Sequence, residues 1–274
     1  MLLDLHTHST ASDGQYTPSE LVQMAKEHGL EIYAITDHDT ISGIAEGRQA
    51  ADALGVHFVP GIEISSDGGE EVHVVGLGID ENDPVLAAEC QAFIESRDNR
   101  GEVICEYLNG LGMNVTMKEI KEIAGDANIA RPHFAAWLQA HGYVEERKAA
   151  FKLYLDTPEF HEATDRRLPS VERSIELIHG AGGKAVLAHP GLLKMPLEEQ
   201  EQLVQRMKAA GLDAIECSYQ KHTPEQVELY DSWAKKDDLM ISCGSDFHGE
   251  QVKKDVPFGM ELVKEDQIER LVVR

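Results

Sequence analysis

Short apolar segments alternate with helix-like segments along most of the chain, and this alternation limits the folds that the chain can adopt. The segments 2–6, 32–35 and 184–188 have the length and composition of buried strands. Each is followed by a segment with helical periodicity, and repeated strand–helix units build mainly parallel sheets covered by helices. With 274 residues, 42% of them hydrophobic, the chain is long enough for one large α/β barrel or for a core domain with an insertion.

Signals for helix starts occur where this alternation requires helices. Thr17 provides an N-cap, Pro18 suits the first helical position, and Glu20 completes a capping box. The pattern predicts a helix that ends near His28, before Gly29.

The segment 83–169 departs from the alternation. It begins with one long helical pattern, contains a further capping box at Thr116 and a helix start at Arg131, and has no strand-like alternation. We therefore expect a barrel domain made of residues 1–82 and 170–274, and a helical insertion subdomain, residues 83–169, that covers the active site.

The formal net charge of −24 argues against a surface that binds long nucleic acids or an anionic membrane. A small anionic substrate is still possible, because exposed charges are screened beyond about 8 Å at physiological salt. The four cysteines are far apart and form no CxxC pair, so neither a disulfide scaffold nor a zinc knuckle is indicated. No signal-peptide pattern or long apolar run is present, and we expect a soluble cytoplasmic protein.

Pairs of potential metal ligands occur near both ends of the chain. His6 and His8 are two positions apart at the end of a predicted strand, so both side chains can point to one face and bind one cation. Asp246 and His248 repeat this spacing after the predicted strand 240–244. The alternative for the first pair is two histidines on the surface.

Single polar residues also interrupt apolar strands. Glu63 stands between Ile62 and Ile64, and a buried lone carboxylate costs several kcal/mol unless it is paired or bound to a metal. The alternative is a glutamate on an edge strand that faces water. His73 stands among valines, where a hydrogen-bonded core histidine is the alternative.

The candidate ligands all lie at or near the C-terminal ends of predicted strands, or in the loops that follow, where α/β barrels carry their sites. Imidazoles combined with a few carboxylates suit Zn, Mn or Fe(II) better than Ca or Mg. The ligands are too many for one tetrahedral ion, so we predict two to three divalent metal ions (Mn, Fe or Zn), with Glu63 bridging two of them. The candidates are His6, His8, Asp13, His38, Glu63, His73, His189, Asp246 and His248.

Five motifs, in this order, resemble those of the PHP (polymerase and histidinol phosphatase) family of metal-dependent phosphoesterases. The resemblance spans residues 2–249 and is strongest to stand-alone bacterial members active on nucleoside 3′,5′-bisphosphates and short RNA ends. It implies a distorted (β/α)7 barrel with a helical insertion and a trinuclear metal centre. The motifs are His6-Thr-His8-Ser9, Thr36-Asp37-His38, Gly61-Ile-Glu63, Ala188-His189-Pro190 and Gly244-Ser245-Asp246-Phe-His248-Gly249.

The resemblance also implies how the ligands are shared. The first metal would be held by His6, His8, Glu63 and Asp246, the second by Glu63, His73 and His189, and the third by Asp13, His38 and His248. Many trinuclear family members have a histidine where this chain has Asp13. Arg131 and His133, at a helix start in the insertion, would bind a substrate phosphate.

We therefore expect hydrolysis of a phosphate monoester of a small nucleotide-like substrate, such as a nucleoside 3′,5′-bisphosphate. A metal-bridged hydroxide held by Glu63, Asp246 and His189 would attack phosphorus. Alternatives are a phosphodiesterase or 5′-3′ exonuclease acting on short oligonucleotides or cyclic phosphates, a histidinol-phosphate-type phosphatase, and a non-catalytic metal- or nucleotide-binding module. We expect a small phosphorylated partner and no stable binding of long nucleic acid or membrane. The sequence assigns no role to His161, Arg166 and His222.

Overall fold

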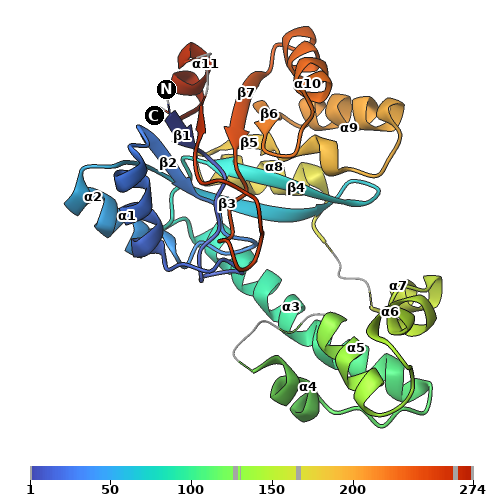
Figure 1. Cartoon of the computed structure of the whole chain (residues 1–274). Helices are drawn as coiled ribbons and strands as arrows, with labels where there is room; N and C mark the ends of the chain where they lie inside the picture. The colour runs from blue at the N-terminus through green and yellow to red at the C-terminus, as the bar shows by residue number, and fades with distance from the viewer. Residues whose placement is uncertain (1, 126–128, 130, 165–167, 262–264, 273–274) are drawn as a thin grey trace. The chain divides into compact units, whose positions relative to one another are not determined.

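The computed structural model describes residues 2–125, 129, 131–164, 168–261 and 265–272 (Figure 1). By its internal contacts the chain divides into two compact units. Unit 1 comprises Met1–Gln91 and Leu168–Arg274, and unit 2 comprises Ala92–Arg167. The domain boundaries expected from the sequence, and the covering role of the insertion, stay predictions.

Unit 1 is built on one eight-stranded sheet with the strand order β7-β6-β5-β4-β3-β2-β1-β8. Strands β1, β2 and β3 are parallel to one another, as are β5, β6 and β7. Strand β4 is antiparallel to both of its neighbours, and β8 is antiparallel to β1. The strands are β1 (Leu2–Asp4), β2 (Ile32–Ile35), β3 (His57–Asp67), β4 (Glu71–Leu77), β5 (Lys184–Leu187), β6 (Ala214–Tyr219), β7 (Met240–Gly244) and β8 (Met260–Glu261).

The sheet is nearly closed into a barrel by the segments that follow β1 and β7. Thr7 and Phe247 form a parallel bridge. Next to it, the His8 amide donates to the Phe247 carbonyl at 2.9 Å, and the Asp246 amide donates to the His6 carbonyl at 2.8 Å. The predicted α/β barrel is confirmed, with a short β8 that the sequence did not indicate.

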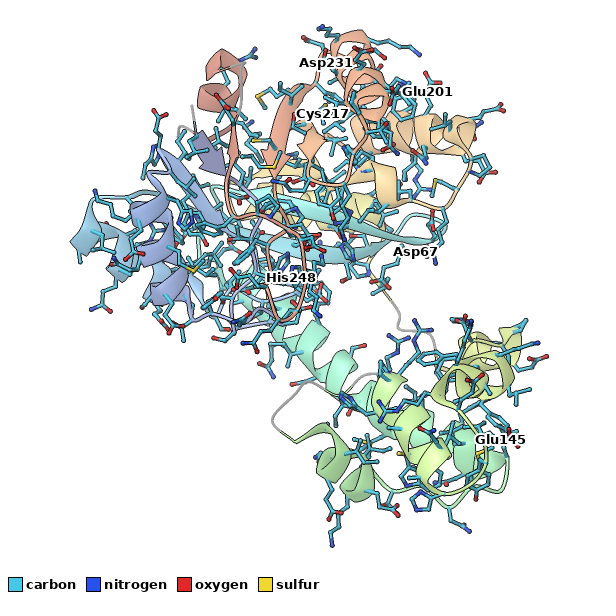
Figure 2. The ribbon with its side chains drawn as sticks, in the orientation of Figure 1. Asp67, Glu145, Glu201, Cys217, Asp231 and His248 are labelled. Carbon is cyan, nitrogen blue, oxygen red and sulfur yellow. The ribbon has the colours of Figure 1, made fainter. Side chains whose placement is uncertain are left out.

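Strand β4 reverses direction because a three-residue turn, Gly68 to Glu70, connects it to β3. So short a connection joins antiparallel strands, whereas a parallel pair needs a crossover of a dozen or more residues. Asp67 marks the turn end of this hairpin (Figure 2). As a result, the beginning of β4 lies at the same edge of the sheet as the ends of the parallel strands.

Helices flank the sheet of unit 1, with α1 and α2 beside β1–β3, and α9 and α10 beside β5–β7 (Figure 1). The predicted first helix is confirmed: the Thr17 side chain accepts from the Glu20 amide, and Gly29 ends the helix in the left-handed conformation at φ 72°. The helices are α1 (Pro18–His28), α2 (Ile44–Leu54), α8 (Val171–Gly180), α9 (Leu197–Ala209), α10 (Pro224–Lys236), α11 (Glu265–Val272) and a 3-10 turn (Pro190–Leu192).

Apolar clusters of described residues lie on both sides of β2. Alternate side chains of β2 point to opposite faces, as expected for a strand. Ile32 and Ala34 join a cluster to which β1 and β3–β7 also contribute. Tyr33 and Ile35 pack instead with residues of α1 and α2, including Leu21. β2 is therefore covered on both faces, which keeps the end that carries His38 in place.

Unit 2 has its own apolar cluster, which includes Phe134, Trp137 and Phe160. Its described residues form helices and no strand. In the described part of the whole chain, no helix is both long and apolar enough to cross a membrane. The remaining elements are α3 (Pro84–Gly110), which contains the boundary between the units, α4 (Met117–Ala124), α5 (Arg131–Ala140), α6 (Arg147–Ala150), a π-helical turn (Phe151–Leu155) and α7 (Pro158–Thr164).

Candidate metal centre

Glu63 lies in the middle of β3 with no exposed surface, and its carboxylate is surrounded by histidine rings. This excludes the alternative of a glutamate that faces water. Oε2 lies 3.1 Å from Nε2 of His6, 3.2 Å from Nε2 of His8 and 3.0 Å from Nδ1 of His38. Oε1 lies 2.9 Å from Nδ1 of His73 and 3.0 Å from Nε2 of His189.

Backbone hydrogen bonds beyond the ends of the strands bring these rings together. The Glu63 amide donates to the Asp37 carbonyl at 3.1 Å, and the Asp39 amide donates to the Glu63 carbonyl at 2.8 Å, so His38 is placed beside Glu63. The Ala188 amide donates to the His73 carbonyl at 3.1 Å. This bond brings the next residue, His189, alongside His73. The sheet pairing therefore assembles the centre.

Asp246 completes a first group with His6, His8 and Glu63, in which one ligand atom from each residue lies within 4.8 Å of the others. Its Oδ1 is 3.3 Å from Nε2 of His8 and 4.0 Å from Nε2 of His6. The ring centroids of His6 and His8 are 5.2 Å apart, as expected for side chains two positions apart on one face.

The other candidate ligands lie around the same histidines. His38, Glu63 and His73 form a second group, and His189 contacts the same Glu63 oxygen as His73 does. A third group contains His8, Asp13, His38 and His248. In it, Oδ1 of Asp13 lies 3.3 Å from Nε2 of His248 and 3.9 Å from Nδ1 of His8. All nine candidates are therefore brought together, with His8, His38 and Glu63 each belonging to two groups.

Two candidates do not lie where the sequence pattern suggested. We expected every ligand at or near the C-terminal end of a strand or in the loop that follows, but Glu63 is in the middle of β3 and His73 is near the beginning of β4. Glu63 reaches the others because β3 is long and the segment after β2 pairs with it at His38. His73 reaches them because β4 is antiparallel, so its start is at the edge where the parallel strands end.

Several polar atoms in this cluster are buried and have no hydrogen-bond partner in the described part of the chain. Such atoms show whether the site suits metal ions. A buried polar atom that lacks a partner costs about 1–3 kcal/mol. Imidazole nitrogens and carboxylate oxygens gathered in this way are the donors that Zn, Mn and Fe(II) prefer. The cluster is therefore suited to divalent metal ions. The atoms are Nε2 of His6, Nδ1 and Nε2 of His8, Oε2 of Glu63 and Nδ1 of His73.

Without metal ions, the carboxylates of the centre favour the protonated forms of His8 and His73. Burial lowers the pKa of His8, but contacts with Asp246 and Glu63 outweigh it and raise this pKa to about 9. Burial also opposes the charged form of His73, but Glu63 and then Glu71 raise its pKa to about 10. Metal ions must displace these protons, because a metal-bound imidazole nitrogen carries no proton.

Buried aspartates that the sequence did not single out as functional fix the loops of the centre. Asp37 accepts hydrogen bonds from the Ser9 amide at 2.7 Å, the Ser9 hydroxyl at 2.7 Å and the Ser12 hydroxyl at 2.6 Å, which holds the loop that carries Asp13. Asp4 accepts from the Ser245 amide at 2.9 Å and its hydroxyl at 2.6 Å. Both aspartates stand within two residues of a candidate histidine in the sequence. This position is the sequence signal that could have identified them as supporting residues.

The Asp246 side chain is oriented by two donors on its second oxygen. The Tyr219 hydroxyl donates to Oδ2 at 3.1 Å, and the Lys253 ammonium donates to it at 2.5 Å. Both donors leave Oδ1 directed to His8. The backbone of Asp246 has φ 57° and that of His189 has φ 26°, conformations that are costly for non-glycine residues and cluster at functional sites. His248 lies on the loop that follows β7 (Figure 2).

Glu216 in β6 is a further buried carboxylate, and the sequence pattern had not predicted a role for it. It stands between Ile215 and Cys217, the same kind of apolar surrounding that drew attention to Glu63. A carboxylate between apolar residues of a strand is therefore the sequence pattern that could have identified Glu216.

The predicted phosphate-binding residues lie at the start of α5 in unit 2. Nη1 of Arg131 is 3.2 Å from Oδ1 of Asp156, which is also 3.1 Å from Nε2 of His161. His133 is in the first turn of the same helix. Their contact with a substrate stays a prediction.

His222 and Arg166 are the two other residues to which the sequence assigned no role. Nε2 of His222 accepts from the Gly191 amide at 3.0 Å, and its Nδ1 donates to the Cys217 carbonyl at 2.9 Å, which is a structural role. Arg166 lies outside the described residues.

The chain is similar to known proteins along nearly its whole length. The PHP domain matches residues 4–163. A 5′-3′ exoribonuclease of Haemophilus influenzae is 38% identical, with 89% of each chain covered. A 3′,5′-nucleoside bisphosphate phosphatase of Chromobacterium violaceum is 36% identical, over 90% of this chain and 87% of the relative. The structure of an amidohydrolase from Chromobacterium violaceum with bound sulfate superposes with a TM-score of 0.76 at 35% identity, covering 95% of this chain and 92% of the other.

Proposed function

The chain belongs to the PHP domain family, and on this premise we propose that it is a metal-dependent phosphoesterase that hydrolyses a phosphate monoester of a small nucleotide-like substrate. The named relatives are an exoribonuclease and a phosphatase, both hydrolases of phosphate esters. The observation that carries the proposal is the carboxylate of Glu63 with five histidine nitrogens at 2.9–3.2 Å. We propose a nucleoside 3′,5′-bisphosphate or a similar compound as the substrate.

Two or three ions of Mn, Fe or Zn would be held by the nine candidate ligands, with Glu63 shared between ions. When bound, such ions lower the pKa of water from 15.7 to about 7 and stabilise the negative charge on a phosphoryl group. The chain itself contributes the carboxylates of Asp13, Glu63 and Asp246, which balance part of the charge of the ions. The remaining positive charge is available to a phosphate dianion, which explains how an acidic chain can bind an acidic substrate.

The residues around the ligands have positioning roles in this proposal. Tyr219 and Lys253 hold Oδ2 of Asp246, so Oδ1 stays directed to the centre. Lys253 also brings a positive charge next to the carboxylate of Asp246. In unit 2, Asp156 holds the guanidinium of Arg131, whose planar donors suit a phosphate. Arg131 and His133 would bind a phosphate group of the substrate and fix its orientation.

Cleavage of a phosphodiester is the second candidate function. It is favoured by the identity of 38% to an exoribonuclease, with 89% of that relative covered. The same ligands can serve both reactions, since each requires stabilisation of charge on a phosphoryl group. The length of the substrate therefore distinguishes the two functions.

A substrate panel tests both functions. Protein treated with a chelator and then supplied with Mn, Zn or Fe would be given a nucleoside 3′,5′-bisphosphate, a short 5′-phosphorylated RNA and a cyclic nucleotide, and released phosphate and nucleotides would be measured. We expect fastest release of phosphate from the bisphosphate. Full activity of the metal-free protein would overturn the proposal.

A matched pair of variants controls for folding in this assay. Asp246→Ala should lower activity at least 100-fold, because it removes a proposed metal ligand. Asp237→Asn changes another buried carboxylate of unit 1, which binds Gln205 and Lys208 instead of the centre, and it should retain activity.

A further inference from the structure

Glu216 contacts two candidate metal ligands through its two carboxylate oxygens. Its Oε1 lies 3.1 Å from Nδ1 of His6, and its Oε2 accepts a hydrogen bond from the backbone amide of His189 at 2.7 Å. Glu216 is only 2% exposed. His6 follows β1 and His189 follows β5, so one side chain on β6 connects ligands from two distant segments.

The first contact determines which nitrogen of His6 faces the centre. An ionised carboxylate can only accept hydrogen bonds, so Nδ1 of His6 carries a proton. In the neutral ring, Nε2 then has the free lone pair, and Nε2 is the atom that lies 3.1 Å from Oε2 of Glu63. Metal-binding histidines are usually fixed in this way by a carboxylate on the other ring nitrogen.

The second contact supports an unusual backbone. His189 has φ 26°, which costs a non-glycine residue about 1–3 kcal/mol unless its surroundings hold it. The hydrogen bond from its amide to Glu216 is one such restraint. With this backbone, Nε2 of His189 lies 3.0 Å from Oε1 of Glu63.

Gly244 leaves the space that the first contact requires. A Cβ atom at this position would lie 2.2 Å from Cβ of His6 and 2.6 Å from Oε1 of Glu216. Any larger residue would force His6 and Glu216 apart. The close contact between His6 and Glu216 therefore depends on the glycine at position 244 in β7.

We propose that Glu216 is a positioning residue that holds His6 and His189 together, and that it thereby supports binding at two metal positions at once. This inference rests on the proposed metal centre. Glutamine is a sharp test, because its amide has one acceptor oxygen and two N–H donors. Glu216→Gln therefore keeps at most one of the two contacts and turns an N–H group towards the other donor.

Calorimetric titration of chelator-treated protein with Mn²⁺ tests the proposal without any activity assay. We expect Glu216→Gln to weaken binding of both the first and the second equivalent of Mn²⁺ by about 10- to 100-fold, the usual range for residues that orient metal ligands. Asp237→Asn, the matched buried carboxylate, should bind Mn²⁺ like the wild type. Unchanged Mn²⁺ binding by Glu216→Gln would overturn the inference while the proposed function stands. A wild-type protein that binds no Mn²⁺ would overturn both.

The wild-type protein provides a second measurement if Glu216→Gln does not fold. Long-range ¹H–¹⁵N spectra of the Zn²⁺-loaded protein distinguish the two ring nitrogens of a histidine, and the His6 signals are identified by their loss in His6→Asn. We expect a proton on Nδ1 of His6 and none on Nε2. A proton on Nε2 instead would overturn the role of Glu216.

Discussion

Nε2 of His6 and Oε2 of Glu63 lie 3.1 Å apart in a buried site, and neither atom has a hydrogen-bond partner among the described residues. Two polar atoms held this close in a buried site are suited to bind one cation between them. A divalent cation can bind both atoms at once. Divalent cations can also bind the buried ring nitrogens of His8 and His73, which likewise lack a hydrogen-bond partner among the described residues.

Removal of metal ions should therefore destabilise the protein. Binding to the folded state alone stabilises it by about 2.7 kcal/mol when free ligand is at 100 times Kd. We expect Mn²⁺ to raise the Tm of chelator-treated protein by several degrees, as measured by circular dichroism. Glu63→Gln, which lacks the shared carboxylate, should respond much less. Identical Tm values with and without Mn²⁺ would contradict the prediction.

Metal binding should strengthen as the pH rises from 7 towards 10. The pKa of His8 is raised to about 9 and that of His73 to about 10, so both rings are protonated at neutral pH in the metal-free protein. The metal-binding neutral forms become common only as the pH approaches these values, so affinity rises and protons are released at pH 7. Titration in two buffers of different ionisation enthalpy counts these protons. His73→Asn should release fewer, whereas His57→Asn, at an exposed position, should not change the count.

Asp13→Asn should remove one equivalent of metal and leave the rest bound. Asp13 contacts His8 and His248 at the edge of the centre, and its side chain is 46% exposed, so it has no direct part in the group around Asp246. Elemental analysis of the purified variant should show about one ion fewer per chain than the wild type. Asp52→Asn, at an exposed position of α2, should show none of this loss. Loss of all metal from Asp13→Asn would show that the ligands are not divided as proposed.

Gly244→Ala should weaken both stability and metal binding. The added Cβ atom would overlap Cβ of His6 at 2.2 Å, and overpacking of this kind costs about 1–3 kcal/mol. Urea unfolding measures the change in the free energy of unfolding, and Mn²⁺ titration measures the change in binding. Gly180→Ala is the matched control, because its added Cβ would meet no described side chain or packed segment within 4 Å beyond its own helix backbone and chain neighbours. Equal behaviour of the two variants would rule out the close approach at Gly244.

Arg131→Ala should act on the choice of substrate. If Arg131 binds a second phosphate group, its loss should raise KM for a nucleoside 3′,5′-bisphosphate about 10-fold or more and leave KM for an aryl phosphate nearly unchanged, because a charge-assisted hydrogen bond contributes about 1.5–3 kcal/mol. Arg147→Ala, an exposed arginine of the same unit, controls for general charge effects. Equal changes in KM for both substrates would remove the proposed role.

Local sequence signals predicted most elements of unit 1, because caps and apolar runs act over a few residues. The helix after Thr17 and the strand 240–244 are examples. The direction of β4 was not foreseen, since an apolar run looks the same in either orientation. The three residues between β3 and β4 are too few for a parallel crossover, and they were the signal that could have shown it.

The ligands were easier to predict than the residues that support them. Histidines in apolar strands are conspicuous in any sequence, as His73 shows. Glu216 has the same kind of apolar surrounding, but its partners are 210 and 27 residues away in the chain, and only the folded sheet brings them together. Whether the nine candidates bind metal as proposed stays a prediction.

The hydrogen bond between the Asp246 amide and the His6 carbonyl, 2.8 Å long, joins residues that are 240 positions apart (246 − 6). An ion bound to both side chains would act there as a cross-link between the first and last parts of the chain. Closing a loop of this length restricts the unfolded chain by an entropy worth about 5 kcal/mol, as a disulfide at the same place would. The metal centre would then also stabilise the closed barrel, because it links the segments that follow β1 and β7.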